Sequence, residues 1–331
     1  VCLVASYFAP IWWVSLTAPN YPADAFPDGI RIHFHFDGVY NGCRAAGKDT
    51  RMANEIIQKD LSHEDERYNP ITDAKKDLNK GAEGLDCVHE MNTINHYVGM
   101  FPIATGAPVE KPLAKFFFGF FAVMLLAFAM AKKKPRLLVL TVGFAAVAAW
   151  MLVDQYMLGH LETHVQAYMQ EAGTFFKEPD KIKVWGDNVR SISHIVIFGL
   201  IGIMAFIIAA TAKIRPFQLL LALVPALLPV FFVVTYAGWL WFFGHNMHPW
   251  GAFTVKPFMP TVFGEGKVAQ FSTFSYPYWG YGLLIAIFIC MMLALLIRRK
   301  QLREGTAELI TWRLCIIWPD LVWPPPFSLY S

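Results

Sequence analysis

The stretch that decides the fold is residues 113–158, LAKFFFGFFAVMLLAFAMAKKKPRLLVLTVGFAAVAAWMLVDQYML, in which a basic break separates two long apolar runs. A helix needs about 20 apolar residues to cross the hydrocarbon core of a bilayer. Each run meets that length, so the stretch predicts two membrane-spanning helices. The break, Lys132-Lys133-Lys134-Pro135-Arg136, is short and rich in Lys and Arg, which places it on the cytoplasmic side.

The same pattern continues along the chain, with further basic breaks at Lys213-Ile214-Arg215 and Arg298-Arg299-Lys300. A composition of 56% hydrophobic residues and a mean hydropathy of +0.40 indicate an integral membrane protein. The net charge of +3 is small, and the basic residues flank the apolar runs, which argues against a nucleic-acid partner. Six apolar runs are predicted to span the membrane: residues 1–17, 113–131, 137–158, 193–212, 217–243 and 278–297.

We therefore predict an all-α integral membrane protein with six transmembrane helices and a small α+β extracytoplasmic domain. It would be a multi-pass protein of a bacterial inner membrane, cytoplasmic or intracytoplasmic, with the lipid bilayer as its first partner. The predicted organisation is a first transmembrane helix (1–17), the extracytoplasmic domain (18–112), a five-helix region (113–308) with outer loops at 159–192 and 244–277, and a cytoplasmic tail (309–331).

Within the predicted outer domain, residues 30–37 alternate strictly between apolar and polar side chains, which is typical of a strand. The pair Asp37-Gly38 then predicts a turn. Residues 52–80 are charged and helix-prone, whereas the loop at 244–277 is rich in Pro, Gly and aromatic residues and is expected to be irregular.

Two cysteines, Cys43 and Cys87, share the predicted outer domain, where oxidising conditions permit a disulfide. The same two thiols are also suitable metal ligands. The sequence leaves both interpretations open, and both require the two residues to lie close together.

All ten histidines lie on, or at the edge of, segments placed outside the membrane, and imidazole is the commonest protein ligand for transition metals. The densest group of donors is Cys87 with His89, Met91, His96 and Met100. Soft sulfur and nitrogen donors together favour copper, and zinc is compatible with Cys and His. The alternative is that the methionines pack against the membrane surface and His96 closes a turn.

Three smaller groups of donors are also candidates. In a strand, His33 and His35 would share one face, although Arg31 beside them would repel a cation. His160 and His164 are spaced to share a helical face above Asp154, a carboxylate near the hydrocarbon edge that is costly unless it is functional or hydrogen-bonded to a neighbouring helix. The last group directly follows the fifth span and consists of His245, Met247 and His248.

The stretch Ile94-Asn95-His96-Tyr97-Val98-Gly99-Met100 resembles an N-H-Y-[IV]-G-M motif of small membrane proteins encoded beside copper-enzyme maturation systems of the nitrous-oxide-reductase type. Two further blocks are similar to that family, from Tyr21 to Ile32 and from Gly244 to Pro277. The chain departs from the family pattern at His248, where an acidic residue is expected, and in the charged insert at 43–86. The resemblance implies a copper-associated membrane protein.

These observations predict an accessory protein that binds or delivers copper at the outer membrane face to a copper-dependent membrane or periplasmic enzyme or transporter. His89, Met91, His96 and Met100 would form one wall of the site, and His245, Met247 and His248 the other. The two loops that carry them are therefore expected to converge. The alternative is a non-catalytic docking subunit of a larger membrane redox complex. An enzyme is the weaker interpretation, because no general base stands beside an obvious substrate pocket.

Overall fold

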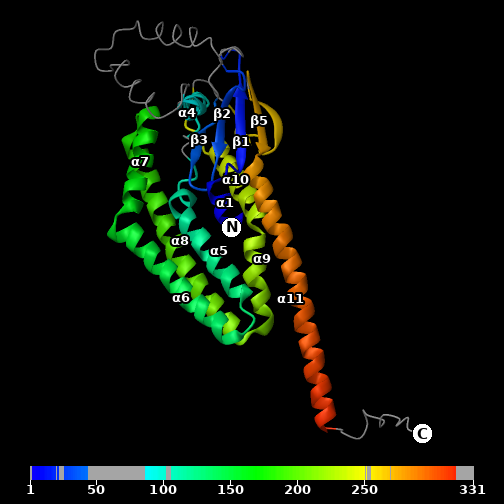
Figure 1. The fold of residues 1–331 in the computed structure, drawn as a ribbon. Helices are drawn as coiled ribbons and strands as arrows, with labels where there is room; N and C mark the ends of the chain where they lie inside the picture. The colour runs from blue at the N-terminus through cyan, green and yellow to red at the C-terminus, as the bar shows by residue number, and fades with distance from the viewer. Residues whose placement is uncertain are drawn as a thin grey trace, which may run out of the picture.

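The structure, a computed structural model, describes residues 2–19, 21, 26–43, 86–101, 106–249, 251, 255–268 and 270–317, with side chains up to residue 304 except that of residue 215. Long helices form one half of the molecule, and a five-stranded antiparallel sheet lies at one end of them (Figure 1). The predicted helix-prone stretch 52–80 and the last part of the predicted tail, 318–331, lie outside the described residues.

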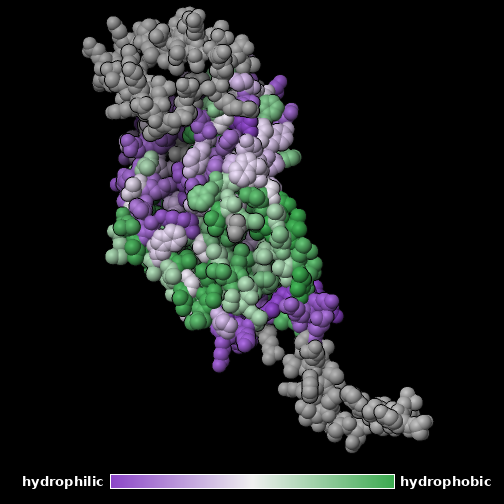
Figure 2. All heavy atoms as spheres, in the orientation of Figure 1, coloured by the Kyte–Doolittle hydropathy of each residue, from purple (hydrophilic) through white to green (hydrophobic). Residues whose placement is uncertain are grey.

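Five helices of the described chain are long and apolar enough to cross a membrane. Figure 2 shows hydrophobic residues gathered over this helical half, between hydrophilic residues at its two ends. The chain is thus a multi-pass membrane protein by the length and composition of its helices. The five are α5 (Glu110–Ala129), α6 (Lys133–Leu152, continued to Met157 by the π-helix η2, Val153–Met157), α8 (Pro179–Lys213), α10 (Leu228–His245) and α11 (Trp279–Ile317).

The basic breaks cluster at the end of the helices away from the sheet. The Arg298 guanidinium on α11 donates to the Ala131 carbonyl in the α5–α6 turn at 3.1 Å. Arg136 at the start of α6 donates to the Met130 carbonyl at 2.7 Å, which ties the same turn from its other side. These side chains thus satisfy carbonyls of the turn that directly follows α5.

The predicted spanning helix over residues 1–17 is wrong. The chain forms a short helix, α1 (Cys2–Phe8), and then a strand, β1 (Trp12–Thr17). Trp12, Val14 and Leu16 alternate with Trp13, Ser15 and Thr17, so the segment has the two-residue period of a strand with two different faces. Its backbone hydrogen bonds are made to the strands on either side of it, and it therefore lies at the centre of the sheet.

The sheet has the order β3 (Val39–Asn41), β2 (Ile30–Phe34), β1, β5 (Phe271–Pro277) and β4 (Gly264–Val268). The predicted strand and the turn after it are present as β2 and the β2–β3 hairpin. The loop expected to be irregular instead supplies β4 and β5, and β5 pairs with β1 from Trp12↔Pro277 to Thr17↔Ser272. The small domain formed by this sheet, which the sequence predicts to lie on the outer side and which we call the outer domain, is therefore built from segments that are far apart in the chain.

The helix α4 (Cys87–Tyr97) packs on one face of this sheet, where Leu16, Ile30, Ile32 and Met91 form an apolar cluster. Asp86 caps the helix, since its carboxylate accepts from the backbone N–H groups of the second and third helical residues at 3.1 and 3.2 Å.

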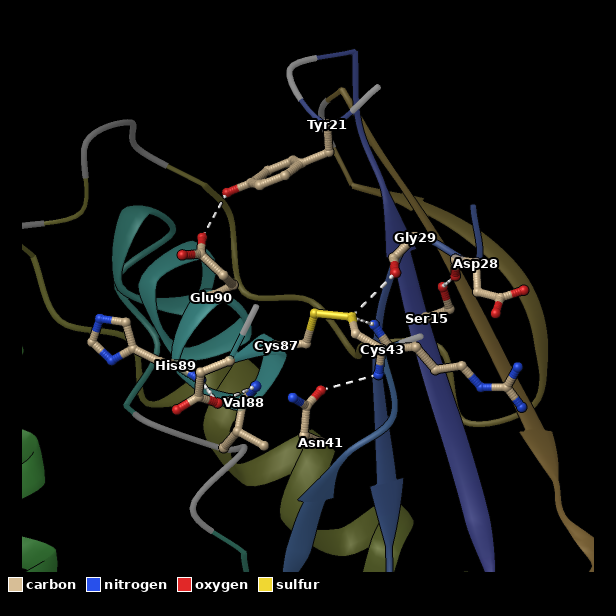
Figure 3. The surroundings of a disulfide bond; sticks show 12 residues. Ser15, Tyr21, Asp28, Gly29, Asn41, Cys43, Cys87, Val88, His89 and Glu90 are labelled. Atoms are coloured by element: carbon tan, nitrogen blue, oxygen red, sulfur yellow. Dashed lines mark hydrogen bonds between the residues drawn. A yellow bond between two sulfur atoms is a disulfide. The ribbon is translucent and has the colours of Figure 1, made fainter. Parts of the chain in front are cut away.

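A disulfide between Cys43 and Cys87 joins the second residue after β3 to the first residue of α4, with Cα atoms 6.1 Å apart (Figure 3). The Tyr21 hydroxyl donates to the Glu90 carboxylate at 3.2 Å, a second link between the sheet side and α4. Cys43 and Cys87 thus form a structural disulfide, and in this state they have no free thiol to offer a metal.

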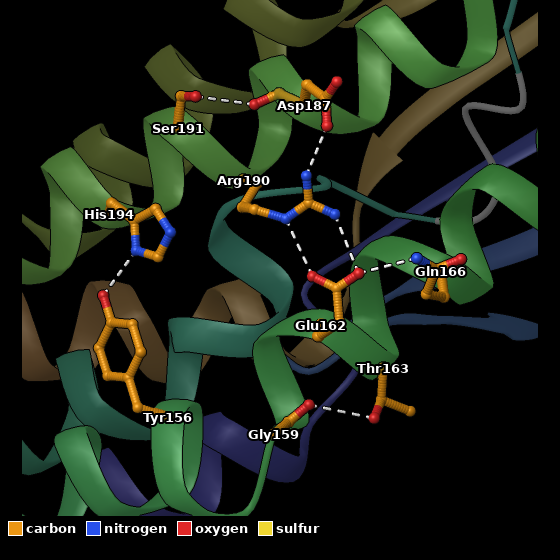
Figure 4. A network of polar contacts seen from close by, with 9 residues as sticks. All are labelled: Tyr156, Gly159, Glu162, Thr163, Gln166, Asp187, Arg190, Ser191 and His194. Atoms are coloured by element: carbon orange, nitrogen blue, oxygen red, sulfur yellow. Dashed lines mark hydrogen bonds and ion pairs between the residues drawn. The ribbon is translucent and has the colours of Figure 1, made fainter.

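The helix α7 (His160–Phe175) lies beside the outer part of α8. The guanidinium of Arg190 donates to both Glu162 oxygens at 2.9 Å, in the bidentate geometry that arginine and carboxylate groups favour (Figure 4). The hydroxyl of Tyr156 lies 2.6 Å from Nδ1 of His194. Residues 214–227 form a 3₁₀-helix, η3 (Arg215–Leu219), and a short helix, α9 (Leu220–Ala226), so the predicted fifth span is interrupted before α10 begins.

Candidate functional site

The two outer loops that carry histidines meet in the structure. The His248 N–H donates to the Gly99 carbonyl at 2.6 Å. Gly99 has a φ of +83°, and a Cβ at this position would clash with the His248 carbonyl oxygen. Gly251 closes the same contact, because its Cβ would lie 3.0 Å from the Gly99 nitrogen. The glycine that follows His96 in the sequence therefore permits the approach of the second loop.

Three histidines surround the consecutive phenylalanines at the end of α7, Phe175 and Phe176, which we call the outer histidine cluster. The rings of His96 and His248 lie 5.1 and 4.8 Å from the ring of Phe176. The rings of His96 and His89 lie 5.7 and 5.9 Å from that of Phe175. The helix α4 thus supplies His89 and His96, and the loop after α10 supplies His248, to the surroundings of these two phenylalanines.

A carboxylate completes this cluster. Nε2 of His248 lies 2.8 Å from Oε2 of Glu178, which also receives the Lys181 ammonium at 2.7 Å. Hydrogen bonds from Lys181 and His248 lower the pKa of Glu178, so it is a carboxylate at neutral pH. Burial lowers the pKa of His96, and the nearby His248 lowers it further. His96 is therefore a neutral imidazole, which is the form that binds metals.

The methionines divide into two groups. Met100 and Met247 both belong to the apolar cluster around Phe243, directly beside the two converging loops. Met91 is only 5% exposed and packs between α4 and the sheet. His245 is exposed, stacks on Trp241 with ring centres 4.5 Å apart and lies 2.8 Å from the Trp241 carbonyl through Nδ1. Met91 and His245 thus make these contacts away from the Phe175–Phe176 pair.

The donor set of the cluster can be compared with what a metal needs. Nowhere in the described residues do three or more His, Cys, Asp or Glu side chains converge as a ready-made metal site. A closed tetrahedral zinc site requires four such ligands. Imidazoles and thioethers, the donor types found on and beside the two converging segments, are those that suit a soft monovalent ion. Nδ1 of His96 is buried and has no hydrogen-bond partner in the described part of the chain, as an unfilled ligand position would require.

His33 and His35 lie on the sheet and make other contacts. The His33 ring stacks on Tyr278 at 5.0 Å, while Nδ1 of His35 lies 3.1 Å from the Phe8 carbonyl. The Arg31 guanidinium lies 4.3 Å from the ring centre of Trp13. Burial lowers the pKa of His33 to about 4, and the charges of Arg31 and His35 contribute to this shift. This face of the sheet is thus an aromatic surface with one embedded cation.

His160 and Asp154 form a second polar group, together with a lysine from the adjacent helix. Oδ1 of Asp154 receives the Lys115 ammonium at 2.7 Å and lies 3.0 Å from Nδ1 of His160, while Gln155 donates to Oδ2 at 2.7 Å. The carboxylate is 5% exposed and lies in the π-helical turn η2, so these groups compensate its burial. His164 lies on the same helix as His160, but its Nε2 lies 2.8 Å from the Pro108 carbonyl.

Sequence reasoning missed Lys115 and Glu178. Lys115 had a usable signal, because it is a lone cation just inside one apolar run and Asp154 is a lone anion near the same end of the next. Glu178 had none, since its role depends on the end of α7 lying beside a loop that follows it by 70 residues. Comparisons with protein-family models, with curated proteins and with solved structures find no match to this chain.

Proposed function

We propose that this chain is a membrane-embedded accessory protein that binds a copper ion at its outer face through His96 and His248. From there it would pass the ion to a copper-dependent membrane or periplasmic enzyme or transporter. The observation that carries the proposal is the convergence of two histidine-bearing segments that are distant in the sequence, joined by the hydrogen bond from the His248 N–H to the Gly99 carbonyl at 2.6 Å.

The chemistry of the surroundings supports copper over harder ions. The donors on the converging segments are imidazoles and, in the apolar cluster beside them, the thioethers of Met100 and Met247, which suit monovalent copper better than magnesium, calcium or zinc. His89 lies on the exposed side of the same cluster, where an arriving or departing ion would pass. The Glu178 carboxylate adds a negative charge beside His248 that favours a bound cation.

The test measures copper retained by the full chain purified from membranes without chelator. His96→Ala and His248→Ala should each remove most of the bound copper, and the double variant should lose little more than either single variant, because the two residues act as one site. His245→Ala is the matched control, since this histidine is exposed and contacts Trp241. Small additive losses at all three positions would show that these histidines are separate surface groups.

A second candidate function is that of a docking subunit in a membrane redox complex. The aromatic face of the sheet favours it, because Trp, Tyr and Arg are the residues most enriched in interface hot spots. Trp13, Arg31 and Tyr278 pack together there, and Tyr40 is 46% exposed beside them. A photo-reactive group placed at Tyr40 should then cross-link to a redox subunit in native membranes, whereas one at Met259 should not.

A further inference from the structure

A cavity of about 720 Å³ lies among α5, α8, α9 and α10, below the β2–β3 hairpin. Its wall is almost entirely apolar and is dominated by phenylalanine side chains. Ile203, Phe206 and Phe231 both line the cavity and are about half exposed or more on the outside of the helices, at 51%, 63% and 47%. The cavity therefore reaches the surface that lipid tails cover.

The cavity is long as well as apolar. Its wall follows α5 from Glu110 to Met124, which is about 21 Å of helix at 1.5 Å per residue. One leaflet of a bilayer has a hydrocarbon thickness of about 15 Å, half that of the whole core. A single lipid chain that enters from the outer leaflet can therefore lie along α5 over its full length.

The outer end of the cavity is polar. Glu110 lines it and accepts a hydrogen bond from Nε1 of Trp239 on Oε1 at 3.0 Å. Its second oxygen is buried and has no hydrogen-bond partner among the described residues. Asp37, between the lining residues Phe36 and Gly38, has one oxygen in the same state. Lys111 and His35 also line this end, and Asp37 lies close enough to the Lys111 ammonium to act on it as an opposite charge.

We propose that this cavity binds a membrane lipid whose head group carries a primary ammonium, with one acyl chain along α5 and the ammonium at Glu110. A buried carboxylate oxygen without a partner requires a donor, and a charged donor forms the stronger bond. The Glu110 carboxyl at the mouth, with one buried oxygen open to a donor, selects a positive head, and the phenylalanine wall accepts the chain. This proposal is independent of the metal site, because it uses none of the histidine cluster.

The experiment compares lipids with identical acyl chains and different heads, bound to the full chain and counted by native mass spectrometry. The probes are phosphatidylethanolamine, phosphatidylcholine, which has a cationic head without N–H groups, and phosphatidylglycerol, which has hydroxyl donors without a cation. The wild-type chain should retain the ethanolamine lipid at least tenfold more than either of the others. Equal retention of the three lipids would overturn the proposal.

Two variants locate the binding. Glu110→Gln keeps the shape and the acceptor for Trp239 while it removes the charge, and it should reduce the tenfold preference to less than threefold. Ala114→Trp fills the cavity, since Ala114 is buried in its wall, and should abolish retention of all three lipids. Leu126→Trp is the control, because Leu126 lies on the same helix and is 59% exposed. A preference that survives Glu110→Gln would place the head group elsewhere.

Discussion

At the scale of single residues, the charges inside the helical half are compensated by specific neighbours. Asp154 is the clearest case, because the Lys115 ammonium, His160 and Gln155 all contact its carboxylate. The sequence marked Asp154 as costly in its position, and the structure supplies the partners that reduce that cost. The π-helical turn that holds it also connects α6 to the outer segment.

We expect Lys115→Met to lower the free energy of unfolding by about 1–3 kcal/mol, because it leaves a buried carboxylate without its charged donor. The methionine keeps the apolar stem that packs beside Phe116. Thermal unfolding in detergent measures the effect. His160→Ala is the control and should cost less, since the His160 side chain is 53% exposed. Equal losses in the two variants would contradict the dominant role of the lysine.

His33 predicts a pH dependence of the outer domain. Its pKa is lowered from 6.5 to about 4 in the folded state, with Arg31 and His35 as the charged groups that face it. Between pH 6.5 and about 4, His33 is therefore protonated in the unfolded chain but neutral in the folded chain. The free energy of unfolding is consequently highest above pH 6.5 and decreases as the pH falls toward 4. Wild-type protein in chelator should lose more thermal stability from pH 7 to pH 5 than His33→Phe, which keeps the stack on Tyr278. Equal losses of thermal stability in the two proteins would show that His33 does not contribute to this pH dependence.

At the scale of elements, the convergence of the two outer loops rests on Gly99. Gly99→Ala combines a left-handed backbone, which costs about 1–2 kcal/mol for a residue with a Cβ, with a clash against the His248 carbonyl. Gly264→Ala is a matched control, because Gly264 has a φ of +92° and open space around it. The variant at position 99 should therefore lose more thermal stability and release copper. Equal stability losses and unchanged copper would show that the loop contact is dispensable.

The same scale shows what the sequence predicted and what it could not. The apolar runs from residue 113 onward predicted five helices because their length alone is informative. Residues 12–17 were misassigned to a helix, although their two-residue alternation was visible, because average hydropathy over a long window hides a period of two. The pairing of β1 with β5 joins segments about 260 residues apart, and no local pattern specifies such a pairing.

For the site, the sequence predicted the meeting of the two loops, which the hydrogen bond between His248 and Gly99 confirms, while the metal-binding role of His96 and His248 stays a prediction. Met91 and His245, which the sequence grouped with them, make other contacts in the structure, because spacing along the chain does not tell which way a side chain points. Met91 faces the sheet from the same helix as His96, and His245 ends α10 one turn after Trp241. The partners supplied by α7, Phe175 and Phe176, became visible only in three dimensions.

At the scale of the whole molecule, the outer domain is held by a small sheet and a disulfide that closes 44 residues. In the chain-entropy model a bridge across a loop of this length stabilises by about 4 kcal/mol. The double variant Cys43→Ser, Cys87→Ser should therefore lower the thermal stability of the outer domain, as should reduction of the wild type. Cys2→Ser is the control, since Cys2 is a free and exposed thiol. An unchanged melting curve after reduction would contradict this role.

The central claim for the whole molecule is that the outer face holds one copper ion. The most direct measurement is the metal content of the unmodified chain, purified from copper-replete membranes without added chelator or affinity metal. Elemental analysis should find close to one copper per chain, and reduction to the monovalent state should not release it, because imidazole and thioether donors suit that state. Protein that is folded, carries the Cys43–Cys87 disulfide and contains no copper would contradict the claim, and the docking subunit would take its place.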